Sequence, residues 1–150
     1  MKTIITVAVI IALTIIACGK DRFQTVPQLR LKSRSIDVVP ANGNLRLNVE
    51  YTDKEGDVSD SLLIVRQRLN IRGRIQLPPA PYKIPDFPKT DKGEFEITLA
   101  YQFGLIFGLT PISLPGSLKE VDTLRIKIVA RDKAGNKSDT LVVDNVYVIR

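Results

Sequence analysis

The segment LRLNVEYT, residues 45–52, decides the fold of this chain. Its apolar residues Leu45, Leu47, Val49 and Tyr51 alternate with polar ones. Strict alternation is typical of a β-strand that buries one face, because successive side chains of a strand point to opposite sides. The segment therefore predicts a half-buried strand, and it sets a pattern that other parts of the chain repeat.

The same alternation recurs in FEITLAYQF at 95–103 and in LRIKIVAR at 124–131. Further strands are expected at 29–38, at 62–69 and at 138–149. The first should break near Ser33, and a change of phase near Asp144 predicts a β-bulge in the last. No stretch has helical periodicity of useful length. Six or seven strands joined by turns rich in Gly, Asn and Asp predict an all-β fold, an immunoglobulin-like antiparallel β-sandwich.

Two segments interrupt the strand pattern. Residues 77–88 contain five prolines, which lack the backbone donor that an interior strand needs. We expect a surface excursion there, held down by Tyr82 and Phe87. Residues 104–116 carry no charge and are rich in large apolar side chains. They form either a buried crossover on the core or an exposed apolar patch for a partner, a ligand or a bilayer.

The amino end has the order of a secretory signal: a positive residue, an apolar run and a small residue before a cysteine. The run is short for a transmembrane helix, which needs about 20 apolar residues, because charge returns at Lys20. Its ending, Ile-Ile-Ala-Cys at 15–18, resembles the lipobox of bacterial lipoproteins. The resemblance implies cleavage after Ala17, lipid attachment at Cys18 and stable membrane anchoring.

These patterns predict three parts: a lipoprotein signal peptide at 1–17, a lipidated cysteine with a short tether at 18–26, and the β-sandwich at 27–150. In bacterial lipoproteins an aspartate after the lipidated cysteine typically marks retention in the inner membrane. The residue after Cys18 is Gly19, so the resemblance favours the outer membrane. The sandwich would then lie on the periplasmic or the cell-surface face of that membrane. The membrane, through the lipid anchor, is the first expected partner.

Composition narrows the function further. The formal net charge of +6 suits anionic headgroups or acidic glycans, and nucleic acid is not expected in this compartment. The chain has no histidine, and its single cysteine is assigned to the lipid. That excludes Ser-His-Asp and Cys-His catalysis and the common zinc sites. No glycine-rich phosphate loop is present. We therefore expect a protein that is not an enzyme and needs no cofactor.

One basic candidate site follows from even spacing. If the strand at 62–69 ran straight on through Gly73, four arginines would share one face: Arg66, Arg68, Arg72 and Arg74. They would form either an anion-binding stripe or the solvated face of an edge strand, where charge discourages pairing with other chains.

One acidic candidate site follows from the expected topology. In an immunoglobulin-like sandwich the loop after the second strand and the loop before the last strand lie at one end. That would gather five oxygen ligands of the kind that Ca²⁺ prefers: Asp53, Glu55, Asp57, Asp132 and Asn136. The alternative is turn chemistry, in which Asp and Asn bond their own backbones while Gly56 and Gly135 supply positive φ.

The acidic loop also carries the one catalytic alternative. A glycosidase needs two carboxyl groups about 5–10 Å apart across a cleft. The candidates for such a pair are Asp53, Glu55, Asp57 and Asp60.

Two motifs point to a family. YTDKEGDV at 51–58 and ARDKAGNKS at 130–138 resemble the hairpins of uncharacterised bacterial lipoproteins with a single immunoglobulin-like or fibronectin-III-like domain. The resemblance implies periplasmic or surface display and no known enzymatic activity. We therefore expect a non-catalytic, lipid-anchored binding or assembly module for another envelope protein or a glycan. The alternatives are a carboxylate-dependent hydrolase acting on a glycan and a calcium-stabilised adhesion-type domain.

Overall fold

The computed structural model describes residues 26–58, 61–84 and 87–150. The predicted signal peptide, Cys18, the tether up to residue 25 and Asp60 lie outside the described residues. In the part that is described, no helix is both long and apolar enough to cross a membrane.

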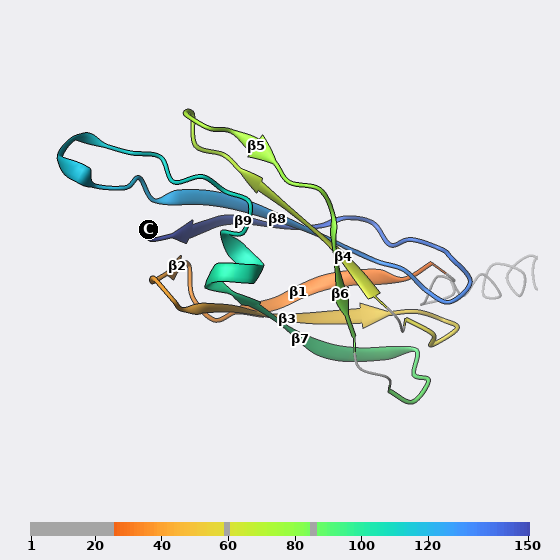
Figure 1. The fold of residues 1–150 in the computed structure, drawn as a ribbon. Coiled ribbons are helices and arrows are strands. Elements are labelled where there is room, and N and C mark those ends of the chain that lie inside the picture. Colours follow the sequence, from red (N-terminus) through yellow and green to blue (C-terminus); the bar gives the residue numbers. More distant parts are fainter. Residues whose placement is uncertain (1–25, 59–60, 85–86) are drawn as a thin grey trace, which may run out of the picture.

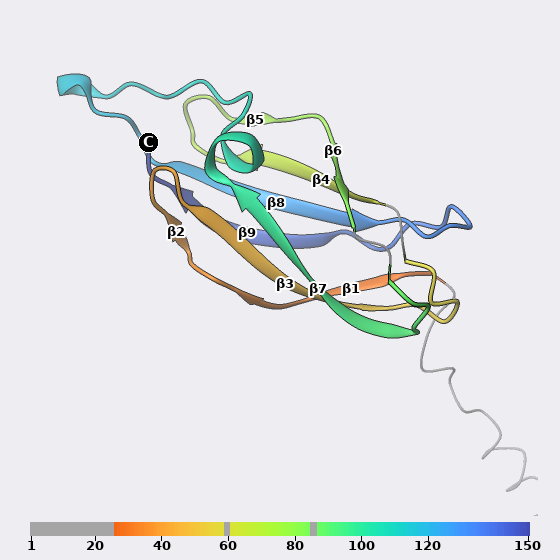
Figure 2. The same ribbon diagram turned by 60° about the horizontal axis from the view of Figure 1, so that its bottom comes forward.

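The fold consists of two β-sheets that face each other (Figures 1 and 2). The smaller sheet has three antiparallel strands in the order β1 (Gln28–Arg34), β3 (Asn44–Thr52), β7 (Lys92–Ala100). The larger has the order β2 (Val38–Val39), β9 (Leu141–Val148), β8 (Asp122–Ala130), β4 (Ser61–Arg68), β5 (Ile75–Gln76), and β6 (Ala80–Lys83) also pairs with β4. The predicted all-β, sandwich-like fold is confirmed at this level.

The chain crosses from one sheet to the other near its start. β1 pairs with β3, and their register shifts between Leu31 and Ser33. The chain then leaves that sheet, and β2 pairs in parallel with β9 of the larger sheet. The predicted break near Ser33 is confirmed. It lets one extended segment pair with β3 of the smaller sheet through β1 and with β9 of the larger sheet through β2.

The core lies between the sheets and follows the alternation of the sequence. In β3, β4 and β8 every second residue is buried, as the period of two requires. The largest fully buried side chains come from both layers: Leu45, Leu47, Ile97 and Val49 on one side, and Leu62, Leu124, Ile126 and Ile128 on the other. Burying each such side chain stabilises the fold by about 1.5–3 kcal/mol.

The last strand contains the predicted bulge. Leu124 pairs with Val146 whereas Ile126 pairs with Val143, so β9 has one residue more than β8 across this step. Asn145 adopts a left-handed conformation with φ of 56°. Asparagine tolerates that region better than most residues, which explains how the strand changes phase beside Asp144.

The expected strand at 95–103 is wrong in its last part. β7 ends at Ala100, and Tyr101–Leu105 form a single π-helical turn, η1. The chain folds back so tightly that a Cβ added at Gly104 would lie 2.8 Å from the Cα of Leu99. η1 therefore turns Leu105 into the core and leaves Phe103 exposed.

Residues 104–116 divide between the two expected outcomes. Leu105 and Leu109 are buried in the core, whereas Phe107 is 65% exposed. The segment continues into a long loop that carries a short 3₁₀ turn, Pro115–Ser117, at one end of the molecule (Figure 1).

The proline-rich segment behaves as expected of an edge. Within it, β6 pairs with β4 from Ser61↔Lys83 to Ile64↔Ala80, on the side of β4 away from β8. Tyr82 and Phe87 both pack against the core, which confirms their predicted role.

Candidate functional site

The four arginines do not form one stripe. β4 ends at Arg68, and the chain then turns through Gly73, whose φ is 80°. The condition for a shared face, a straight strand through Gly73, is therefore not met. Arg66 and Arg68 are only 6% and 5% exposed, whereas Arg72 and Arg74 lie at the surface.

Arg68 belongs to a buried ion network. Its Nη1 donates to the carboxylate Oδ1 of Asp122 (3.2 Å), and Nε of Arg150 donates to Oδ2 of the same carboxylate (2.6 Å). Arg68 also donates to the carbonyl oxygens of Gly73 and Thr110, both at 2.7 Å. These bonds fasten the long loop and the C-terminal residue to the sheet, so Arg68 has a structural role.

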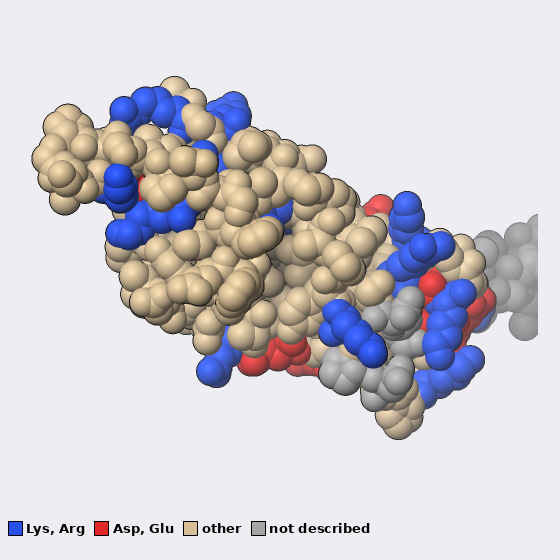
Figure 3. Space-filling view, viewed as in Figure 1, with Lys and Arg blue, Asp and Glu red and all other residues tan. Residues whose placement is uncertain are grey.

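The two exposed arginines of the four, Arg72 and Arg74, make few contacts. Arg72 donates to the Glu120 carboxylate at 3.2 Å, and Arg74 makes a long contact with the Leu69 carbonyl oxygen at 3.5 Å. Figure 3 shows many of the positive side chains toward the two ends of the molecule, with a largely uncharged surface between them.

The acidic loops show the turn chemistry considered as the alternative to calcium. Asp53 is buried and accepts hydrogen bonds from the backbone N–H groups of Glu55 (3.3 Å) and Asp57 (3.1 Å). Asp132 accepts from the backbone and side-chain amides of Asn136, both at 2.7 Å. Gly56 and Gly135 have the expected positive φ, 62° and 93°.

The two loops lie at the same end of the molecule (Figures 1 and 2). Nevertheless, no group of three or more acidic, Cys or His side chains converges on a metal-sized site among the residues described. The five candidate calcium ligands therefore remain in two separate turns. Binding of calcium by either turn stays a prediction.

Asp53 and Asp57 form a buried acidic pair. Burial raises the pKa of Asp53, although its backbone hydrogen bonds lower it, and the adjacent Asp57 carboxyl raises it further. Oδ1 of Asp57 is buried and has no hydrogen-bond partner in the described structure. Neither Asp53 nor Asp57 lines either of the two pockets presented below. Asp60 lies outside the described residues. The glycosidase alternative therefore gains no support.

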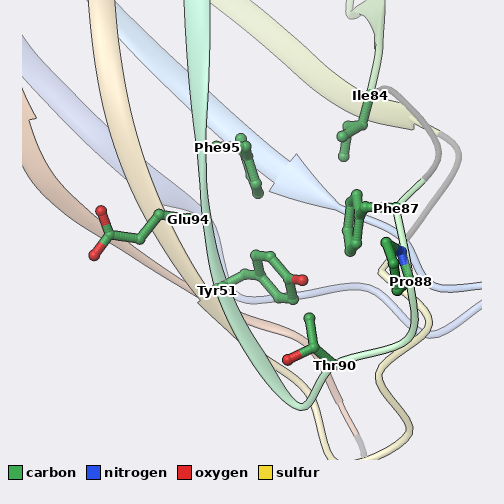
Figure 4. A pocket seen from close by; sticks show the side chains of 8 residues that line it. Tyr51, Ile84, Phe87, Pro88, Thr90, Glu94 and Phe95 are labelled. Atoms are coloured by element: carbon green, nitrogen blue, oxygen red, sulfur yellow. The ribbon is translucent and has the colours of Figure 1, made fainter.

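The same end of the molecule carries an aromatic pocket with a volume of about 460 Å³ (Figure 4). Tyr51 of β3 is at its centre, with its ring centroid 5.4 Å from that of Phe87 and 5.8 Å from that of Phe95. We call this the aromatic pocket; its lining consists of Tyr51, Ile84, Phe87, Pro88, Thr90, Gly93, Glu94 and Phe95.

The sheet register makes room for this pocket. Tyr51 lies directly opposite Gly93, and a Cβ added at Gly93 would lie 2.7 Å from the Tyr51 ring. Only glycine therefore lets the ring lie across β7. Sequence reasoning took Tyr51 and Phe95 as ordinary core residues, because the pairing of Tyr51 with Gly93 is set by a register that no local pattern reveals.

The pocket is suited to apolar binding. Burial raises the pKa of Tyr51, and the Asp53 and Asp91 carboxylates raise it further, so its phenol stays protonated at neutral pH. Glu94 is the single acidic residue in the described lining. Such a surface can accept an aromatic or branched aliphatic side chain and orient it through ring contacts.

Comparison with known proteins gives a fold likeness alone. No protein-family model matches the chain, and no curated protein matches it significantly. The crystal structure of Spo0M, a sporulation control protein from Bacillus subtilis, is similar with a TM-score of 0.43 and 12% identity. The match covers 83% of this chain and 50% of that one. These comparisons identify no family. The resemblance to lipoproteins stays a prediction.

Proposed function

We propose that this chain is a non-catalytic, lipid-anchored module of the bacterial envelope that binds another envelope protein. The observation that carries the proposal is the aromatic pocket: an open, apolar cavity built from three aromatic rings at one end of a β-sandwich. Pockets of this kind bind apolar groups.

We further propose that the sandwich is immunoglobulin-like. The orders β1-β3-β7 and β9-β8-β4 match the way such domains divide their strands between two sheets. The parallel pairing of β2 with β9 makes the first extended segment shared by both sheets. The cysteine pair and tryptophan of antibody domains are not part of this sequence, so the likeness concerns topology alone.

The position of the pocket agrees with an anchor at Cys18. β1 begins at the end of the molecule that carries the aromatic pocket and both acidic loops (Figure 1). Exposed lysines gather in the loops and strand ends of the same region: Lys54, Lys83, Lys89, Lys92, Lys133 and Lys137. A lipid on Cys18 would hold this basic end close to the anionic headgroups of a membrane.

The pocket would accept one apolar side chain of the partner. Burying such a side chain contributes about 1.5–3 kcal/mol, which alone gives weak binding. Anchoring both proteins to the same membrane raises their effective concentration and makes a weak contact sufficient.

Site-specific photo-cross-linking in intact cells tests this function. A photoreactive residue at Thr90, in the pocket, should give a discrete protein adduct, whereas one at Ser117, in the loop at the opposite end, should not. The adduct should disappear in Cys18→Ser, which removes the anchor. No adduct at Thr90, or equal adducts at both positions, would overturn the proposal.

A further inference from the structure

Arg66 differs from Arg68, because among the described residues it is a buried cation without an acidic partner. It lies in β4 and is 6% exposed. Its Nη1 donates to the carbonyl oxygens of Leu105 (3.2 Å) and Phe107 (3.0 Å). Its Nε and Nη2 donate to no acceptor among the described residues. The side chain therefore keeps a guanidinium edge with free donors.

This arrangement is costly for folding. Burial of a charge is unfavourable unless an opposite charge and hydrogen bonds compensate it. Arg68, two residues away, has that compensation in Asp122. Arg66 has only two neutral carbonyls, and burial lowers its pKa with no acidic group acting in the other direction. Positions 62 and 64 on the same face of β4 are Leu and Ile. Departures of this kind from local rules are expected at functional or strained sites.

Arg66 lies in the wall of a second, smaller pocket with a volume of about 110 Å³. The other walls are uncharged and come from β4, β6, the end of β7 and η1. We call this the Arg66 pocket; besides Arg66 it is lined by Ile64, Ala80, Pro81, Tyr82, Leu99, Phe103 and Gly104. Figure 3 shows that the surface over β6 and η1 is largely uncharged. Arg66 is thus the one charged residue in the described lining of this pocket.

The rim offers further contacts. The Tyr82 hydroxyl oxygen accepts a hydrogen bond from the backbone N–H of Thr98 (3.2 Å), so its own proton is available to another acceptor. Phe103 is 78% exposed and lines the pocket from η1. An apolar group that followed the anion into the pocket would bury this ring.

We propose that the Arg66 pocket binds the carboxylate of an apolar monocarboxylic acid. The planar edge formed by Nε and Nη2 matches the two oxygens of a carboxylate. Water occupies about 30 Å³ per molecule, so the pocket has room for a carboxylate and a few attached carbons, and Phe103 and Pro81 cover the rest. A single guanidinium with no second cation suits one negative charge.

This chemistry is shared by two sources: the free C-terminus of a polypeptide that ends in an apolar residue, and a small carboxylic acid. The proposal is independent of the function assigned to the aromatic pocket, because the two sites share no lining residue.

Titration followed by NMR tests the site. The probes are butanoate, the peptide Gly-Gly-Leu with a free C-terminus, and the same peptide as its C-terminal amide, added to the detergent-solubilised full chain. Butanoate or the free peptide should shift the Arg66 Nε–H resonance saturably, and the amide should not. Saturation by butanoate alone assigns the site to small acids. Saturation by the peptide alone assigns it to polypeptide C-termini.

Two matched variants complete the test. Arg66→Met should weaken binding by at least about tenfold, whereas Arg74→Met, which removes the same charge from an exposed arginine, should leave it unchanged. Should Arg66→Met unfold, Phe103→Ser keeps the test open, because it removes only an exposed wall and should weaken binding severalfold. The proposal is overturned if neither acid binds the wild type, if the amide binds equally well, or if both Arg66→Met and Phe103→Ser bind as the wild type does.

Discussion

At the scale of single residues, Asp122 shows how a buried charge is compensated by its neighbours. Its carboxylate is fully buried, and each oxygen accepts a hydrogen bond from a different arginine: Arg68 from β4 and Arg150 from the end of the chain. Two cations share one anion here. Arg68 also donates to the carbonyl oxygen of Thr110 in the long loop, and Arg150 donates to that of Leu109.

Replacing Asp122 with Asn should therefore be severely destabilising. It leaves two buried guanidinium groups without their counter-charge, and breaking a buried ion pair from one side costs about 3–5 kcal/mol. Urea unfolding followed by far-UV circular dichroism measures this loss. Glu120→Gln is the control, because Glu120 pairs with the exposed Arg72 and such pairs contribute less than about 1 kcal/mol. Equal losses in the two variants would show that the Asp122 network does not hold this end together.

Asp53 should give the fold an unusual pH dependence. Its pKa is raised in the folded state above the ordinary value of 3.8, chiefly by burial. A raised folded pKa means that the protonated acid contributes stability below the unfolded pKa, and that this contribution is lost as pH rises through the folded pKa. Relative to Asp53→Asn, the wild type should thus lose unfolding free energy as pH rises above about 4.

The measurement is a series of urea unfolding curves at different pH values for the wild type, Asp53→Asn and Asp139→Asn. Asp139 is exposed, and Asp139→Asn removes the same charge as Asp53→Asn. The unfolding free energy of Asp139→Asn should therefore change with pH as that of the wild type does. If the advantage of the wild type over Asp53→Asn grew with pH instead, the two backbone hydrogen bonds to the carboxylate would outweigh its burial.

At the scale of elements, the π-helical turn η1 connects the core to the Arg66 pocket. It provides buried Leu105, exposed Phe103 and the carbonyl oxygen of Leu105, which accepts from Arg66. Single π-helical turns are rare, and those that occur are frequently found at functional sites. Its close return over the end of β7 depends on Gly104.

Gly104→Ala should destabilise the fold by about 1–3 kcal/mol, the range for forcing an extra group into a packed site. The added methyl would lie 2.8 Å from Leu99 Cα and 2.9 Å from its carbonyl carbon, and neither backbone atom can move aside easily. Thermal and urea unfolding measure the loss. Gly116→Ala adds a methyl with nothing within 4 Å, so its cost should be limited to that of a positive φ. A Gly104→Ala variant as stable as the wild type would mean that η1 can move away from β7.

How much of this was predictable depends on the range of the interaction. Alternation predicted β3 and β8, the break near Ser33 and the bulge beside Asp144, because each is encoded in neighbouring residues. The sequence did not predict η1, because Tyr101 and Phe103 continue the alternation of apolar residues that is seen in β7. The burial of Arg68 depends on Asp122, 54 residues away, and the aromatic pocket depends on Tyr51 facing Gly93. Local patterns cannot reveal such pairings.

At the scale of the whole molecule, we expect anchoring and folding to be separable. The buried hydrophobic residues run from Val39 to Val148, and β1 begins at Gln28. The described residues provide a core between the two sheets, so we expect the domain to fold whether or not a lipid is attached to Cys18. Association with a membrane, in contrast, is expected to depend on that lipid, as the lipobox resemblance of residues 15–18 implies.

Cys18→Ser should therefore release the protein without unfolding it. In detergent phase separation the wild type should partition with the detergent as a processed, acylated species, and the variant should appear unprocessed or in the aqueous phase. Its urea midpoint should match the wild type within the roughly 0.5 kcal/mol typical of substitutions outside the core. Thr25→Ser, in the tether, is the matched control and should stay anchored and processed. A Cys18→Ser protein that kept the wild-type mature mass and the detergent phase would contradict the lipoprotein assignment. A variant that was released but unfolded would instead contradict the independence of the core from the anchor.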